Sequence, residues 1–218
     1  MLGKLWNWFI GPDVISRKEK LPYDYVLNLY RYMQVDKPQI DKVELEYIFS
    51  QAEVRIGPLS RRHIFVPPKL NLLKIFFALQ HYNEQIIKLA QDFGDEVWQR
   101  ENCFILTKPG FIVVQPEIDG FNLTYQEQKE LLEEEKRQLI SAEHISWLFA
   151  VWAELYKEAY PLNGFSVRCL NCLAGSDLCL IASNKPNRGY MVSQWHKGQG
   201  HRNLGVIHFD FIPLEQII

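Results

Sequence analysis

The feature that most constrains the fold is a change in hydrophobic period near residue 165. Before this point, apolar residues recur every three or four positions in several stretches, which is typical of amphipathic helices. After it, apolar and polar residues alternate within short segments that Gly, Asn and Pro separate, which is typical of half-buried β-strands. The sequence therefore predicts an α+β protein with a mainly helical N-terminal two-thirds and a C-terminal sheet.

Four strands are predicted in the C-terminal part. Consecutive strands joined by short connections are usually neighbours in a sheet. We therefore expect a four-stranded antiparallel meander formed by residues 165–173, 178–183, 189–195 and 204–211. In its last strand Ile207, Phe209 and Phe211 alternate with His208 and Asp210, so we expect one apolar and one polar face.

Capping signals outline helices in the N-terminal two-thirds. Asp41 with Glu44, and Thr124 with Glu127, have the spacing of capping pairs at helix starts. An apolar stripe over residues 72–93 predicts one long helix between them. Local side-chain chemistry thus marks where these helices begin.

Length and composition bound the domain organisation. The chain has 218 residues, of which 47% are hydrophobic and 23% charged, and these are ordinary globular values. We expect a single domain, 1–218, with two lobes. The first, 20–160, contains a short hairpin at 102–115 and a short strand at 63–66, and the second, 161–218, is the sheet.

Charge and hydropathy exclude some classes of protein. No apolar run reaches the roughly 18 residues that a membrane span needs, and the N-terminal apolar stretch is too short for a secretory signal. We therefore expect a cytoplasmic protein with reduced thiols and no transmembrane segment. The net charge of −2 does not indicate the basic body that sequence-independent DNA binding requires.

Three of the four cysteines fall in the stretch FSVRCLNCLAGSDLCLIAS. A two-residue turn at Gly175 and Ser176 would place Cys172 opposite Cys179, at a hydrogen-bonded position, and we interpret these thiols as buried filler without a cofactor. The alternative is a zinc site. In a regular strand Cys169 and Cys172 point to opposite faces, so this alternative needs a break in the strand. Its ligands would be Cys169, Cys172, Cys179 and His196.

The connection WHKGQGHRNLG, residues 195–205, is longer than a hairpin turn requires. Long loops often carry function, and glycines let backbone amides approach an anion. The predicted anion-binding residues are Lys197, Gly198, Gly200 and Arg202. In a catalytic alternative, a histidine is the general acid or base and an arginine stabilises developing charge. The residues of that alternative are His196, His201 and Arg202.

This loop, taken alone, resembles the glycine-rich loop of the CRISPR RNA-processing endonucleases of the ferredoxin-like class. The helical first half of the chain departs from the strand-first pattern of those enzymes. Neither a phosphate loop, a G-x-S-x-G elbow nor an H-E-x-x-H pair occurs in the sequence.

The N-terminal segment, residues 1–15, is amphipathic and rich in aromatic residues. Trp6 and Phe9 lie in a short helical stripe, with Trp8 beside it, that is suited to contact a partner protein, although packing on its own domain or on a membrane interface would use the same pattern. The favoured hypothesis is a non-enzymatic interaction or assembly subunit of a larger intracellular complex. The alternative is a phosphodiester- or phosphate-directed enzyme, for example in RNA processing, with nucleic acid as its partner.

Overall fold

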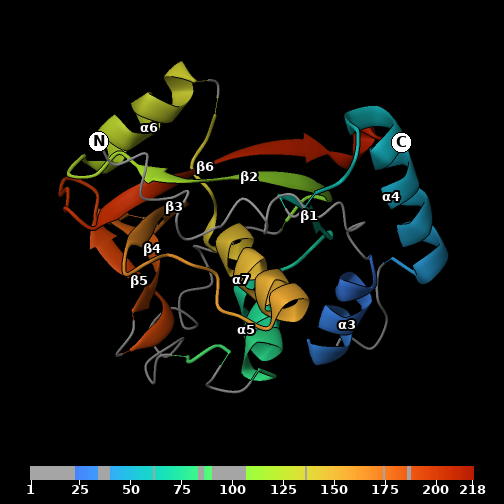
Figure 1. Cartoon of the computed structure of the whole chain (residues 1–218). Helices are drawn as coiled ribbons and strands as arrows, with labels where there is room; N and C mark the ends of the chain where they lie inside the picture. The colour runs from blue at the N-terminus through green and yellow to red at the C-terminus, as the bar shows by residue number, and fades with distance from the viewer. Residues whose placement is uncertain are drawn as a thin grey trace.

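The computed structural model describes residues 23–33, 40–60, 62–82, 86–89, 107–135, 137–173, 175–185 and 188–218, with the side chains of 115–117 left out. The elements of this part of the chain begin with helices, and four consecutive strands follow the last α-helix (Figure 1). They are α3 (Asp24–Tyr32), α4 (Lys42–Ile56), β1 (His63–Val66), α5 (Leu72–Gln80), β2 (Gly110–Asp119), α6 (Tyr125–Glu134), α7 (Ala142–Tyr156), β3 (Ser166–Cys172), β4 (Leu178–Lys185), β5 (Gly189–His196), β6 (Leu204–Pro213) and the short 3₁₀-helix η2 (Leu214–Gln216).

The six strands form one mixed sheet in the order β1-β2-β6-β3-β4-β5. β6 runs antiparallel to β2 and parallel to β3, with Leu204 opposite Ser166. The predicted four-stranded antiparallel meander is therefore wrong, because β6 does not pair with β5. The mainly helical N-terminal part is also wrong, since β1 and β2 come from it and alternate with helices. One sheet thus runs through both predicted lobes.

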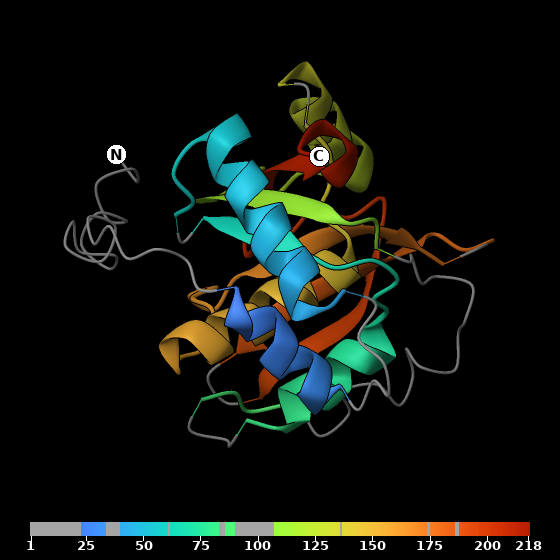
Figure 2. The ribbon, with the colours of Figure 1, turned by 90° about the vertical axis from the view of Figure 1, so that its right-hand side faces the viewer.

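Helices cover both faces of this sheet. In Figure 1, α7, α5 and α3 lie below the strands, whereas α6 lies above β2 and β6. We call these sides the α7 face and the α6 face. Figure 2 shows α4 crossing the end of the sheet, where the ring of Phe49 contacts Phe65 of β1 and Phe111 of β2 edge-on.

Side chains of the helices also satisfy the outer edge of β1. The Phe65 amide donates to the Tyr25 hydroxyl at 2.8 Å, and the Trp147 indole donates to the Phe65 carbonyl at 2.8 Å. An edge strand with unpaired amides and carbonyls invites pairing with another chain. Here α3 and α7 supply the missing partners, so this edge is capped within the molecule.

Predictions that rest on local chemistry are confirmed. The Asp41 side chain accepts the Glu44 amide at the start of α4, and Thr124 with Glu127 forms a reciprocal capping box at α6. Strand β1 has the expected bounds, His63–Val66. These signals work because a cap or a short apolar run acts within a few residues of its own position.

The long helix predicted over 72–93 is wrong, because α5 ends at Gln80. The chain then extends to the outer edge of β5, where the Lys88 carbonyl accepts the Tyr190 amide at 2.6 Å and Leu89 forms a parallel bridge with Tyr190. A Cβ at Gly189 would lie 2.1 Å from the Lys88 oxygen, so only glycine permits this close approach.

The first strand of the hairpin predicted at 102–115 lies mainly outside the described residues. In the described part, residues 110–113 of β2 pair with β1 on one side and with β6 on the other. Thr107 bonds to the backbone of Lys69 and Leu70. The Lys-Pro-Gly turn does precede the strand, but its neighbours come from distant parts of the sequence.

Candidate functional site

The predicted functional loop, residues 197–203, is a crossover connection. β5 and β3 both run antiparallel to β4, and β6 runs parallel to β3, so β5 and β6 point in the same direction. The chain must therefore return along the sheet before β6 can begin. The loop begins near the β3–β4 turn, where the Lys197 amide donates to the Asp177 carbonyl. It ends beside the start of β3, where the Ser166 amide donates to the Asn203 carbonyl. The topology explains why this loop is long.

A buried arginine lies beneath the crossover. Arg168 of β3 is fully buried, and its guanidinium donates to the carbonyls of His196 at 3.2 Å and Gln199 at 2.7 Å. It also donates to the Cys179 thiol at 3.3 Å. Hydrogen bonds to carbonyl oxygens thus offset most of the free-energy cost of burying this cation. Sequence reasoning missed Arg168, whose signal is that it is the one charged residue of its strand.

The backbone of the crossover is held on its other side by the segment before α6. The Asn122 amide donates to the His201 carbonyl at 3.2 Å, and the Tyr125 amide to the Lys197 carbonyl at 2.8 Å. A Cβ at Gly200 would lie 2.1 Å from the Asn122 oxygen. Close packing of two backbones therefore accounts for this glycine.

The side chains predicted for chemistry have different surroundings. The Lys197 ammonium donates to the Ser176 carbonyl at 3.0 Å, whereas His196, His201 and Arg202 are exposed. The His201 ring accepts the Asn203 amide through Nδ1 and lies edge-on to Trp195. Within the described ranges, no hydrogen bond joins His196, His201 or Arg202 to a carboxylate. Their catalytic and anion-binding roles stay predictions.

The three cysteines of the hairpin divide between the two faces. Cys169 is buried in the main core with α7, whereas Cys172 and Cys179 lie with Arg168 and Tyr125 on the α6 face. The predicted opposition of Cys172 and Cys179 is confirmed by the strand register. Among the described residues, no group of three or more His, Cys, Asp or Glu side chains could hold a metal ion.

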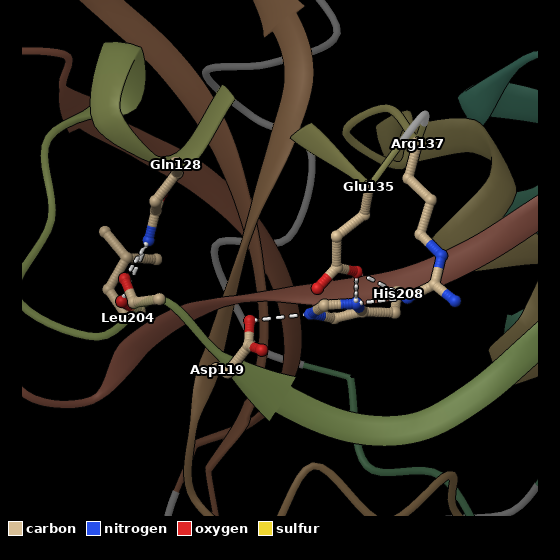
Figure 3. Close-up of polar contacts among 7 residues, drawn as sticks. Asp119, Gln128, Glu135, Arg137, Leu204 and His208 are labelled. Atoms are coloured by element: carbon tan, nitrogen blue, oxygen red, sulfur yellow. Dashed lines mark hydrogen bonds and ion pairs between the residues drawn. The ribbon is translucent and has the colours of Figure 1, made fainter. Parts of the chain in front are cut away.

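A second polar cluster surrounds His208 of β6, which is 5% exposed (Figure 3). Its Nδ1 lies 2.7 Å from Arg137 Nη1 and 3.1 Å from a Glu135 oxygen, and these two partners pair with each other at 2.7 Å. Its Nε2 lies 2.7 Å from Asp119 Oδ1, a short contact that is not aligned as a hydrogen bond. Strands β2 and β6 and the segment after α6 thus meet at one imidazole.

A β-bulge lies opposite this histidine. Val114 pairs with Phe209 and Ile118 with Ile207, so three residues of β2 stand opposite His208 alone. Proline at 116 has no amide hydrogen to donate, and proline within sheets is confined to edges and bulges. The bulge displaces the end of β2 so that Asp119 reaches the imidazole.

The arrangement defines what this cluster can do. Imidazole with a carboxylate is a set that general acid–base catalysis uses. Here both ring nitrogens already contact charged side chains, and the ring is almost fully buried, so the cluster joins three segments rather than presenting a free base. Gln128 of α6 adds a second link by donating to the carbonyls of Gly120 and Leu204 (Figure 3).

Comparison of the chain with protein-family models, with curated proteins and with solved structures finds no match. Within the described part of the chain, no helix is long and apolar enough to cross a bilayer.

Proposed function

We propose that the protein is a non-enzymatic interaction subunit that binds an amphipathic helix of a partner protein on the outer side of α4. The observation that carries this proposal is a row of large apolar side chains that face water. Val43 is 74% exposed, Tyr47 53% and Val54 77%. We call these residues, with the exposed Ser50 between them, the α4 stripe.

The spacing of the α4 stripe suits a helical partner. Positions 43, 47, 50 and 54 are four, three and four residues apart, which places them on one side of the helix. The opposite side, with Leu45, Ile48 and Phe49, is buried in the core. Helix-in-groove recognition uses apolar anchors at these intervals. An amphipathic helix would cover the α4 stripe along its whole length.

Charge beside the α4 stripe indicates the chemistry of the partner. Glu44 and Glu46 are exposed on either side of its first turn, and Lys42 approaches Glu46 only at 3.9 Å. Exposed pairs at this distance contribute little stability. Glu46 Oε1 also accepts the Tyr23 hydroxyl, so the carboxylate of Glu44 and the second oxygen of Glu46 can pair with a ligand. The partner helix should therefore carry basic residues beside its apolar row.

Trp6, Trp8 and Phe9, the predicted partner contacts, lie outside the described residues. We propose that they form a second contact with the same partner. The exposure of His196, His201 and Arg202 on one crossover favours a rival role in contacting phosphate groups of nucleic acid.

Site-specific photo-crosslinking in the native cell tests the α4 stripe. A benzophenone side chain at Val54 should crosslink to a partner peptide with an apolar helical row and flanking Lys or Arg. The same group at Glu130, exposed on α6, should not. With the benzophenone kept at position 54, the double substitution Val43→Glu, Ser50→Glu should abolish the crosslink without changing the melting temperature, because both positions face water. Deletion of residues 2–10 should weaken recovery of the same partner.

Three results would contradict the proposal: crosslinks from Val54 to residues 1–22 of the same chain, crosslinks only to a second copy, or equal crosslinking from Glu130. The rival has its own measurement. Salt-dependent binding of short RNA that is lost in His196→Ala, His201→Ala and Arg202→Ala would favour nucleic acid.

A further inference from the structure

The register of β3 and β4 places two thiols directly opposite each other. Cys172 pairs with Cys179. At the next residue pair toward the turn, the Leu173 amide donates to the Leu178 carbonyl at 3.1 Å. In an antiparallel ladder, this bond makes the Cys172–Cys179 pair a non-hydrogen-bonded one. The sequence-based prediction that Cys172 and Cys179 form a hydrogen-bonded pair is therefore wrong. A two-residue turn at Gly175 and Ser176 would leave Leu173 and Leu178 without a hydrogen bond between them, whereas in the structure these two residues are bonded.

At a non-hydrogen-bonded position, the two cysteines are close enough for a disulfide. At non-hydrogen-bonded pairs the Cα atoms are about 4.5 Å apart and the side chains are closest. Disulfides span Cα separations of roughly 4.4–6.8 Å. Side chains opposite each other in a ladder also share a face, so both sulfurs lie on the α6 face. The backbone of the hairpin thus already has a separation that a disulfide can bridge.

The two thiols have different access and different neighbours. Cys172 is half-buried, and Cys179 is buried against the Arg168 guanidinium, which donates to its sulfur at 3.3 Å. Burial raises the pKa of the Cys179 thiol, and Arg168 opposes this rise. The accessible thiol is therefore Cys172, and the positive charge lies beside its partner.

We propose that Cys172 and Cys179 form a reversible dithiol–disulfide site that closes across β3 and β4 when the protein meets hydrogen peroxide. Peroxide oxidises the Cys172 thiol to a sulfenic acid and leaves as water. The Cys179 sulfur then loses its proton and attacks the Cys172 sulfur, with the Arg168 guanidinium stabilising the negative charge that develops on it. The S–S bond forms, the S–O bond breaks, and the hydroxide leaves as a second water with the Cys179 proton. Two thiols and one peroxide thus give one disulfide and two waters.

Cys169 provides a matched control within the same hairpin. It lies only three residues before Cys172 but belongs to the core on the α7 face. Burial raises the pKa of its thiol well above the ordinary value, which opposes reaction with peroxide. Asp177 lies between Cys172 and Cys179, so cleavage before this aspartate separates the two halves of the hairpin unless a disulfide joins them.

The test treats the full chain with one equivalent of hydrogen peroxide, blocks the remaining thiols, and maps the product by cleavage at Asp177 and mass spectrometry. The mass should fall by two hydrogen atoms, the two halves of the hairpin should stay joined, and dithiothreitol should reverse both changes. Cys169→Ala and Cys103→Ser should behave like the wild type, whereas Cys172→Ser and Cys179→Ser should not form the product.

A disulfide that needs Cys169 or Cys103 would overturn the proposal. So would sulfinic acid at Cys172 without any joined product, or no reaction at that peroxide level. The wild-type map decides these cases even where a serine variant does not fold.

Discussion

Two histidines on opposite faces of the sheet have opposite kinds of surroundings. On the α7 face, His144 lies beside the rings of Phe209 and Phe211, and its polar contact is the Ser141 hydroxyl at 2.9 Å. On the α6 face, His208 lies among Asp119, Glu135 and Arg137. Neighbouring residues of β6 thus contact an apolar layer on one side and a charged cluster on the other.

The difference shows how each face is held. The α7 face is covered by an apolar helix whose side chains, among them Trp147 and Phe149, are buried in the main core. Among the described residues, the α6 face has a small apolar cluster of Leu132, Leu139 and Val206, with Arg168 and His208 buried nearby. Burial of apolar area stabilises the first face, whereas hydrogen bonds and ion pairs hold the second.

The largest expected effect is on the α7 face. Trp147→Ala should lower the free energy of unfolding by about 3–5 kcal/mol, because it leaves a cavity and removes the donor to the Phe65 carbonyl. Trp195→Ala is the control, since this half-buried indole donates to the Gln199 carbonyl above the α6 face. Urea denaturation measures both. Equal losses of unfolding free energy in the two variants would contradict the contrast between the faces.

The next effect depends on pH. Burial lowers the pKa of His144 from 6.5 to about 4. As the pH falls below 6.5, His144 takes up a proton in the unfolded chain but stays neutral in the folded chain. Stability is therefore lost between pH 6.5 and 4. The loss should reach about 3 kcal/mol.

The comparison variant is His144→Asn, which keeps an acceptor for Ser141 and does not titrate. Unfolding free energies of both proteins, measured at intervals from pH 7 to 4, should converge as the pH falls. Parallel curves would show that His144 is not held neutral by its apolar surroundings.

The smallest effect is expected on the α6 face. His208→Ala at pH 7 should cost about 1–2 kcal/mol, because Asp119 and Glu135 are half-exposed and regain water when the imidazole is removed. Hydrogen exchange should quicken mainly in residues 117–119, which the bulge places near His208. A loss of unfolding free energy as large as that of Trp147→Ala would mean that the His208 cluster stabilises the fold as much as the apolar layer does, and would contradict the contrast.

Local parts of the fold were predictable. The caps at Asp41 and Thr124 and the bounds of β1 follow from interactions within a few residues, and the four C-terminal strands follow from period-two alternation. The end of α5 was not predictable, because the apolar stripe continues past Gln80 while the backbone near Lys88 is bound at the edge of β5. A distant strand overrides the local pattern there.

The candidate sites divide in the same way. The opposition of Cys172 and Cys179 could be counted outward from the turn. Arg168 and His208 could not be assigned, because their partners are carbonyls of a crossover loop and carboxylates of other elements. Proline 116, inside a strand, was the one available signal of the bulge beside His208.

By itself the sequence determined where most helices and strands begin, since capping and hydrophobic alternation act between near neighbours along the chain. Only the tertiary structure decided that β6 inserts between β2 and β3, because any apolar strand can pair with several others and the choice depends on burying both of its edges. That insertion makes the loop at 197–203 a crossover and buries Arg168 beneath it.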